Sequence, residues 1–527
     1  MKRSLLVLLL AGLASVAPAQ TYDVIIRGAK VFDGTGAPWR YADIAVKDDR
    51  IAAVGLVPAE ATAITVIDAQ GLYVSPGFID PHSHSSNALI KADEAGVRAL
   101  VAQGITTAFV NPDGGGAVDI PEQVAAITKA GPGVNVATQI GHNSVRAAVM
   151  AYDNRDPRPE ELDQMKGLID SAMKAGAFGF SSGPFYSPGM YSKTEEIIEL
   201  AKVTARYGGF YSSHIRDDSD YTIGVVAAVD EVIRIAREAK LPGIITHLKT
   251  AGPRVRGFSG EIIKHVEAAR AEGVEVWADQ YPYEASQSSL AAYLIPSWAQ
   301  EGGAAAMRAR LNDPAQAERL KEGIRENFNR RGGARTLQIG NYSADRSLEG
   351  RRLDSIAEER GISPVDLVID LLKDGQGVGM VSFTVNEIDI NGFMRQSWTM
   401  TGSDGGAPVF GQGVPHPRAY GTYPRKIRKY VLETPVISLE RAIHSGTGLP
   451  ASVLGVKDRG FIREGAFADI LVFDLANLRD TATYTQPHGY SEGMVDVLVN
   501  GKFVIRDGAF LDARPGRVLR RNEGPAR

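Results

Sequence analysis

The chain has 527 residues, and 58 Lys and Arg stand against 62 Asp and Glu, which gives a net charge of −4. This length predicts one large domain with a satellite, or two to three domains. The small net charge and the absence of a long basic stripe argue against nucleic acid as a partner. The chain has no cysteine, which excludes thiol catalysis and thiolate ligands, so any bound metal must be held by His and carboxylate side chains.

The first 19 residues have the pattern of a secretory signal peptide. Lys2 and Arg3 precede an apolar run from Leu5 to Val16, and small residues follow as far as Ala19. We therefore expect export, with cleavage after Ala19 and a periplasmic or secreted product. A membrane anchor is the alternative, but the run is shorter than the roughly 20 residues that a span requires. No stable membrane span is expected elsewhere.

Both ends of the mature chain alternate short β-rich runs with turns. These regions are residues 20–72 and residues 451–527. In the second region, Asn500-Gly501 follows the run Val495 to Val499, and Asn-Gly after such a run is a strong hairpin signal. We expect the two ends to form one small β-sandwich domain.

The middle of the chain, residues 73–450, alternates strands with helical patterns such as Ile223 to Lys240 and Ser259 to Glu272. Alternation of this kind predicts a parallel sheet, and eight units predict a (β/α)₈ TIM-type barrel within the α/β class. A doubly wound open sheet is the alternative. An insertion and candidate lid is expected at about 290–390. The predicted strands are 73–80, 105–110, 134–141, 177–182, 209–215, 243–249, 274–283 and 397–404.

Ligand-type side chains follow several of these strands. His82 and His84 are two residues apart and can face one ion. His214, His247 and Asp404 each close another predicted strand, and the carboxyl ends of barrel strands share one rim. Each residue alone could be an ordinary core or loop residue. Together they predict a metal centre in which neutral imidazoles bind Zn²⁺ and Asp404 acts as the general base.

A set of motifs spans the chain from about residue 22 to the C-terminus. They are 76–84 (Pro-Gly-Phe-Ile-Asp-Pro-His-Ser-His), 104–107, 211–216 (Tyr-Ser-Ser-His-Ile-Arg), 246–249, 279–283, 402–405, 416–421 and 515–517. With these motifs the chain resembles the N-acyl-D-amino-acid deacylase (D-aminoacylase) family of the amidohydrolase superfamily. The resemblance implies hydrolysis of an amide bond with one or two zinc ions, His214 and His247 at the tighter site, and His82, His84 and Asp404 around a second position.

The sequence departs from this family at Asp113, which stands where a cysteine ligand is usual. A carboxylate can bind or bridge zinc, so we expect Asp113 to be a ligand. The alternative is a turn residue before Gly114-Gly115-Gly116. A carboxylated lysine is disfavoured, because no lysine closes the predicted strand at 177–182.

By the same resemblance, the substrate is a small molecule with a free carboxylate, and Lys249, Tyr283 and Arg418 are the candidates to bind it. The alternatives are a solvated lysine, a packing tyrosine and a surface-loop arginine. His142 is either a site residue or a structural one. Weaker candidates for the pocket wall are Tyr191, Arg216 and Ser289, whereas His265, His444 and His488 are interpreted as structural or surface residues.

Three functions stay open at this point. The first is deacylation of N-acyl-D-amino acids. The second retains the same chemistry but acts on a dipeptide or on another acylated amino acid, including L-forms. The third is a non-catalytic binding protein, which the retention of His82, His84, His214, His247 and Asp404 disfavours. An oligomer is compatible with all three.

Overall fold

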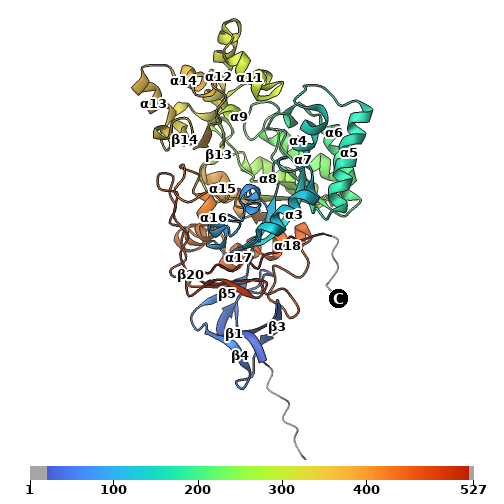
Figure 1. The fold of residues 1–527 in the computed structure, drawn as a ribbon, viewed down its shortest axis with the longest axis vertical. Helices are drawn as coiled ribbons and strands as arrows, with labels where there is room; N and C mark the ends of the chain where they lie inside the picture. The colour runs from blue at the N-terminus through green and yellow to red at the C-terminus, as the bar shows by residue number, and fades with distance from the viewer. Residues whose placement is uncertain (1–20, 522–527) are drawn as a thin grey trace, which may run out of the picture.

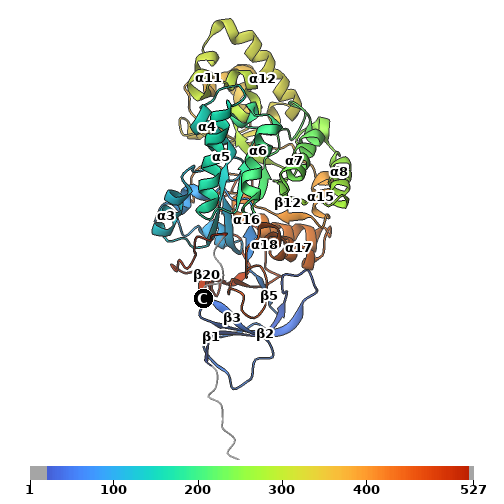
Figure 2. The same cartoon turned by 90° about the vertical axis from the view of Figure 1, so that its right-hand side faces the viewer.

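The structure, a computed structural model, describes residues 21–521, so the expected signal peptide lies outside the described residues. Three tiers follow one another along the longest axis (Figures 1 and 2). A β-sheet from both chain ends lies at one end, the parallel barrel lies in the middle, and the inserted segment lies at the other end.

The middle tier is an eight-stranded sheet in which each strand pairs in parallel with its neighbours. The sheet closes where the backbone N–H of Asp404 donates to the carbonyl of His82 at 2.9 Å, beside a parallel bridge between Ser83 and Gly405. The expected closed barrel is therefore confirmed over the open doubly wound sheet. Its strands are β6 (Phe78–Asp80), β7 (Ile105–Val110), β8 (Asn135–Gly141), β9 (Gly179–Ser182), β10 (Phe210–Ser213), β11 (Gly243–Ile245), β12 (Val276–Gln280) and β16 (Thr399–Thr401).

Aromatic side chains fill the barrel interior below the carboxyl ends of the strands. The ring centroid of Phe109 lies 5.4 Å from that of Phe178 and 5.9 Å from that of Phe210, and all three side chains are buried. A barrel of this size has a packed core rather than a pore. The rim above this layer is therefore the place where polar side chains can gather.

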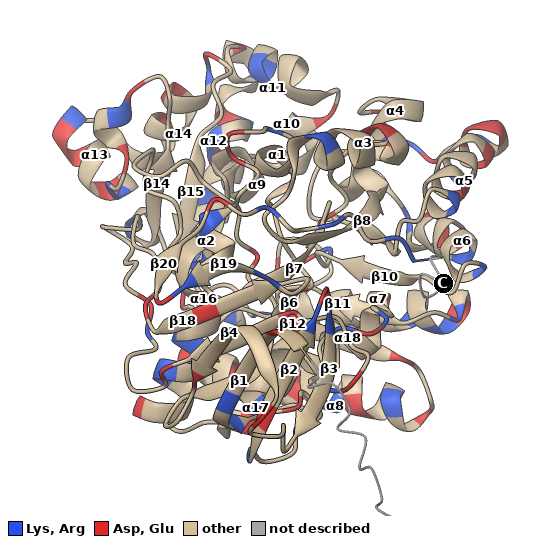
Figure 3. Ribbon diagram, turned by 60° about the horizontal axis from the view of Figure 1, so that its bottom comes forward, with Lys and Arg blue, Asp and Glu red and all other residues tan. Residues whose placement is uncertain are grey.

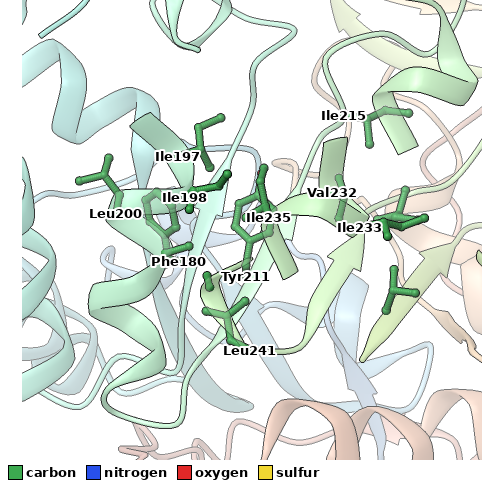
Figure 4. Packing of buried hydrophobic residues seen from close by; sticks show 14 of the residues in the cluster. Phe180, Ile197, Ile198, Leu200, Tyr211, Ile215, Val232, Ile233, Ile235 and Leu241 are labelled. Carbon is green, nitrogen blue, oxygen red and sulfur yellow. The ribbon is translucent and has the colours of Figure 1, made fainter. Parts of the chain in front are cut away.

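Amphipathic helices cover the outside of the barrel. The expected helices at 223–240 and 259–272 are confirmed as α7 (Val225–Ala239) and α8 (Ser259–Ala271). Figure 4 shows Phe180 and Tyr211 of the strands beside apolar side chains of α6 and α7. The other helices around the barrel are α1 (Ser86–Leu89), α2 (Arg98–Val101), α3 (Ile120–Ala130), α4 (His142–Met150), α5 (Pro159–Lys174), α6 (Thr194–Ala205), α15 (Glu387–Met394), α16 (Arg418–Ile427), α17 (Leu439–Gly446) and α18 (Gly448–Leu454).

Both chain ends contribute to one nine-stranded mixed sheet, which confirms the expected β-domain. The two halves meet where β5 pairs antiparallel with β17, and Val24, Ile44, Ile470 and Leu498 lie in its core. The strands are β1 (Thr21–Val31), β2 (Arg40–Lys47), β3 (Arg50–Gly55), β4 (Thr62–Asp68), β5 (Tyr73–Pro76), β17 (Ile470–Phe473), β18 (Met494–Val499), β19 (Lys502–Arg506) and β20 (Ala509–Phe510).

The segment between β12 and β16 has its own small sheet and its own apolar core. Its outer helices, such as α13, carry acidic and basic side chains close together (Figure 3). The sequence predicted an insertion at this place, but not this small sheet. The elements are β13 (Ser286–Ser289), α9 (Leu290–Leu294), α10 (Ser297–Gln300), α11 (Gly303–Leu311), α12 (Ala317–Arg331), β14 (Leu337–Asn341), α13 (Leu353–Arg360), α14 (Pro364–Leu372) and β15 (Gly379–Ser382).

Among the described helices, none combines the length and the apolar character that crossing a membrane requires.

A buried ionic cluster joins α4 to α6. Arg146 is fully buried and pairs with the Glu196 carboxylate, which also lies 2.8 Å from Nε2 of His142. His142 therefore has a structural partner. It is not among the described residues that line the cavity of about 620 Å³ at the rim of the barrel. Burial alone would raise the pKa of Glu196, but the contacts with His142 and Arg146 lower it below its usual 4.5.

We expect Glu196→Gln to lower the free energy of unfolding by about 3–5 kcal/mol at pH 7, because it leaves the Arg146 charge buried and unpaired. Urea unfolding measures the loss. The native pKa of Glu196 is depressed, so its contribution is present above pH 4.5 and declines as the pH falls through the native value. The difference in the free energy of unfolding between the unmodified protein and Glu196→Gln should therefore become smaller as the pH falls. The matched control is Glu199→Gln on the same helix, which removes two solvent-exposed ion pairs, with Lys166 and Lys202, and should cost at most about 1 kcal/mol. Equal losses in the two variants would contradict the prediction.

Candidate metal centre and active-site cavity

Each of the six predicted metal ligands follows the carboxyl end of a barrel strand. His82 and His84 follow β6, Asp113 follows β7, and Asp404 follows β16. His214 and His247 follow β10 and β11. Because these ends share one rim of the closed barrel, six side chains from distant parts of the chain meet above its packed interior.

The side chains converge closely. Ligand atoms of His82, Asp113, His247 and Asp404 all lie within 4.8 Å of one another. Nε2 of His84 lies 3.1 Å from Oδ1 of Asp404, and Nδ1 of His214 lies 2.7 Å from Nε2 of His247. The structure therefore brings together every residue that the sequence proposed as a metal ligand.

The carboxylate of Asp113 lies at the centre of this group. Its Oδ2 atom is 3.4 Å from Nε2 of His82 and 3.3 Å from Nε2 of His84, while its Oδ1 atom is 3.5 Å from Nε2 of His247. The Oδ2 atom is also 3.8 Å from Nδ1 of His214. Oδ2 thus faces three imidazoles and Oδ1 faces the fourth, so this one carboxylate lies within 3.8 Å of all four.

The backbone is strained at three of these positions. Asp113, His247 and Asp404 have φ values of 56°, 37° and 48°, which non-glycine residues rarely adopt. At His247, Oδ1 of Asp279 accepts the backbone N–H at 2.7 Å and holds the turn in place. Strain of this kind is typical of functional sites.

Several buried polar atoms in this cluster have no hydrogen-bond partner among the described residues. They include both ring nitrogens of the fully buried His82, Oδ1 of Asp113 and Nε2 of His214. Buried polar atoms are almost always satisfied, and imidazole nitrogens with carboxylate oxygens are a donor set that divalent zinc-like ions accept. The residues present therefore fit a metal centre.

The electrostatics are also suited to ligation. Burial, together with the charge of Lys249, lowers the pKa of His247 to about 3, so its ring is neutral. Burial alone would raise the pKa of Asp404, but the guanidinium of Arg418, together with His82, holds it well below its usual range. Burial raises the pKa of Asp279 to about 7. Asp279 was not among the predicted site residues, although its place at the end of β12 could have indicated it.

A cavity of about 620 Å³ opens onto this cluster. Lys249 and Arg418 line it, as expected for binding a carboxylate. Nη1 of Arg418 donates to Oδ2 of Asp404 at 2.6 Å, and its Nε atom has no partner among the described residues. Nζ of Lys249 lies 2.9 Å from Nδ1 of His247 and 3.8 Å from Oδ2 of Asp218.

Tyr283 is not among the described residues that line this cavity; it is buried and donates from its hydroxyl to the carbonyl of Pro417 at 3.4 Å. This buried position of Tyr283 matches the alternative that it is a packing residue and does not bind the substrate. Arg216 pairs with Glu231, and Tyr191 and Ser289 also lie outside the lining.

The lining residues that sequence reasoning missed include Tyr186, Asp218 and Tyr293. Tyr186 and Asp218 follow the carboxyl ends of β9 and β10 within five residues, so their place after a strand could have indicated them. Tyr293 lies on α9 in the inserted segment, where no sequence signal indicated the site.

The comparisons with known proteins agree with this geometry. The amidohydrolase family model matches residues 65–505. The D-aminoacylase of Alcaligenes xylosoxydans xylosoxydans is 34% identical, with 96% of this chain and 99% of the relative covered. The N-acyl-D-aspartate deacylase of the same organism is also 34% identical, with coverages of 95% and 96%.

Solved structures show the same relationship. A D-aminoacylase described with a binuclear metal centre superposes with a TM-score of 0.81 at 33% identity, over 95% of this chain and 100% of that one. The N-acyl-D-glutamate deacylase of Bordetella bronchiseptica, complexed with zinc and a phosphonate inhibitor, gives 0.81 at 32% identity with the same coverages. An Arthrobacter aurescens L-hydantoinase, at 18% identity and 0.57, shares the fold. This chain belongs to the amidohydrolase family, in the group that contains D-aminoacylase and the N-acyl-D-amino-acid deacylases.

Proposed function

We propose that this protein is a zinc-dependent amidohydrolase that removes the acyl group from an N-acyl-D-amino acid. The observation that carries the proposal is the convergence of four imidazoles and two carboxylates at the base of a cavity that also holds Lys249 and Arg418. The relatives with the same fold and about one third identity over nearly their whole length are deacylases of N-acyl-D-amino acids.

The zinc ions, one or two per chain, would be held by His82, His84, Asp113, His214, His247 and Asp404. When bound, zinc supplies Lewis acidity and a water of lowered pKa.

Asp404 acts as the general base. Its Oδ1 atom faces His82 and His84, and its Oδ2 atom accepts from Arg418. Arg418 keeps the carboxylate ionised, so that Asp404 can take a proton from the attacking water and pass it to the departing nitrogen of the amide.

Lys249 and Arg418 bind the carboxylate of the substrate. The ammonium of Lys249 is held on the rim by its contact with His247, and Arg418 lines the same cavity while its Nη1 donates to Asp404. Two fixed cationic donors suit a carboxylate. Tyr283 supports Arg418 from below through the neighbouring carbonyl of Pro417 rather than contacting the substrate.

We also propose that the enzyme is exported, because residues 1–19 combine a basic start, a short apolar run and small residues before the cleavage point. It acts on small molecules, and no nucleic-acid partner is proposed. Its substrate would then be met outside the cytoplasm.

The proposed activity is tested by incubating zinc-loaded enzyme with N-acetyl-D-amino acids, N-acetyl-L-amino acids and dipeptides and by measuring the release of free amino acid. We expect hydrolysis of the D-series. Hydrolysis confined to dipeptides or to L-forms would replace the proposed substrate, and hydrolysis of none of them would reject the function.

We expect Asp404→Asn to reduce kcat by about 10²–10⁴-fold, because the amide cannot accept the proton of the water. Steady-state kinetics measure the effect, and circular dichroism with zinc analysis shows whether the fold and the metal content persist. A variant with near-normal kcat would exclude Asp404 as the base.

We expect Asp113→Ala to lose zinc on dialysis, because the carboxylate at the centre of the four imidazoles is removed. Asp113→Cys restores a ligand at this position and should retain more zinc than the alanine variant. Asp119→Ala is the matched control, because Asp119 lies in the same loop and caps α3 with its side chain. Metal analysis of the three variants measures the zinc that each retains and tests whether Asp113 is a ligand. Full zinc occupancy in Asp113→Ala would assign Asp113 to the turn alone.

A further inference from the structure

A second cavity lies at the end of the barrel opposite the candidate metal ligands. It consists of two adjoining hollows of about 590 and 190 Å³, which share the loop 455–459 after α18. Phe178, which directly precedes β9, lines the smaller hollow. So does Leu519, whose backbone N–H donates to the carbonyl of Val136 in β8 at 2.7 Å. The cavity is therefore at the amino ends of the strands.

Two basic stretches of the sequence meet in this cavity. They are 455–463 (Gly-Val-Lys-Asp-Arg-Gly-Phe-Ile-Arg) and 514–521 (Arg-Pro-Gly-Arg-Val-Leu-Arg-Arg). The cations that line the two hollows include Arg50, Lys457, Arg459, Arg463, Arg517 and Arg521. Asp458 is the one acid among the described lining residues. The proposed catalytic centre uses none of these side chains, so their concentration in a cavity calls for another explanation.

Three of the cations belong to ion pairs. Asp469, Asp49 and Asp458 pair with Arg459, Arg517 and Arg463, respectively. Arg459 is only 2% exposed and also donates to Oδ1 of Asn500 at 2.7 Å. These pairs connect the basic stretches with one another and with the terminal β-sheet, and their charges cancel.

The other three cations lack a close acid among the described residues. The guanidinium of Arg50 has no carboxylate oxygen nearer than 3.8 Å. Arg521 donates to the carbonyls of Leu454 and Gly208 and forms no ion pair with a described carboxylate, and burial lowers its pKa. Lys457 is exposed and has no described acidic partner. The six cations and three acids together leave an excess of three positive charges.

The excess charge and the apolar part of the lining indicate the class of ligand. Guanidinium and ammonium groups are the usual partners of phosphate groups in proteins. A phosphate monoester carries about 1.5–2 negative charges at pH 7, so two of them match an excess of three positive charges, whereas two carboxylates would leave one unmatched. Phe178, Val456 and Leu519 lie among the cations and offer carbon surface to an organic body.

We infer that this cavity binds a small organic molecule with two phosphate groups, held by Arg50, Lys457 and Arg521. The bound molecule would join the loop 455–463 to the C-terminal stretch 514–521. Because it binds the folded chain, it should also raise the melting temperature. The inference does not depend on the proposed catalytic function, since none of these residues lies at the rim of the barrel.

The test is calorimetric titration of the zinc-loaded full chain with fructose 1,6-bisphosphate, fructose 6-phosphate and fructose at constant ionic strength. The three probes share one body and differ in the number of phosphate groups. We expect the bisphosphate to bind at least about 10-fold more tightly than the monophosphate, and fructose not to bind. Zinc analysis afterwards shows whether the metal stays bound. Equal affinity for the two phosphates, or no binding, would overturn the inference. Sedimentation with phosphatidic acid vesicles is the second arm, and binding to vesicles without binding to the bisphosphate would replace the small ligand by a membrane lipid.

Substitutions in the cavity test where the bisphosphate binds. Lys457→Gln and Arg521→Gln should each weaken its binding by about 5-fold or more, because each removes one cationic donor. Lys264→Gln is the matched control, because it removes an exposed lysine on α8 and should leave the affinity unchanged. Unchanged affinity in both cavity variants would place the anion at another site, such as the rim with Lys249 and Arg418, and would overturn the inference. If Arg521→Gln does not fold, Lys457→Gln still decides, since Lys457 is exposed.

Discussion

The hydrogen bond from the backbone of Asp404 to the carbonyl of His82 closes the barrel, and the candidate metal centre depends on that closure. Without it, β6 and β16 would be opposite edges of an open sheet, and the His82–His84 pair would lie far from Asp404. With it, the first and last strands are neighbours, and Nε2 of His84 reaches within 3.1 Å of Oδ1 of Asp404. The contact that closes the barrel therefore also assembles the candidate metal centre.

The site also stores conformational strain that the rest of the barrel must offset. The left-handed backbone at Asp113, His247 and Asp404 costs of order 1–3 kcal/mol at each position. The surrounding contacts fix these turns, as when Asp279 accepts the N–H of His247 at 2.7 Å. The packed aromatic layer below the rim supplies rigidity of the same kind, because a dense core resists the rearrangement that would relieve the strain.

The barrel and five of the six candidate ligands could be predicted because each left a local signal, whereas Asp113 was assigned by resemblance. Buried strands such as β7 read as short apolar runs, and a histidine or an acid directly after such a run indicates the rim. The inserted sheet left no such signal, since β13 is Ser286–Ser289 and has no apolar alternation. Tyr293 could not be assigned to the site for a related reason. Its position depends on how the insertion packs onto the barrel, which no local pattern specifies. Tyr283 was assigned by resemblance, and its burial shows that a motif residue need not face the cavity.

The barrel carries the candidate metal ligands, whereas the insertion contributes part of the cavity wall. All six candidate ligands follow strand ends whose geometry barrel closure fixes, whereas Ser286, Tyr293 and Arg331 come from the inserted segment. A change in the insertion can therefore alter the wall of the cavity without moving a ligand. Relatives of 32–34% identity are named for different substrates, D-aspartate and D-glutamate derivatives among them. That variety is expected if the barrel supplies the chemistry and the insertion supplies the selectivity, because substitutions in a wall cost far less than substitutions among ligands that share a metal.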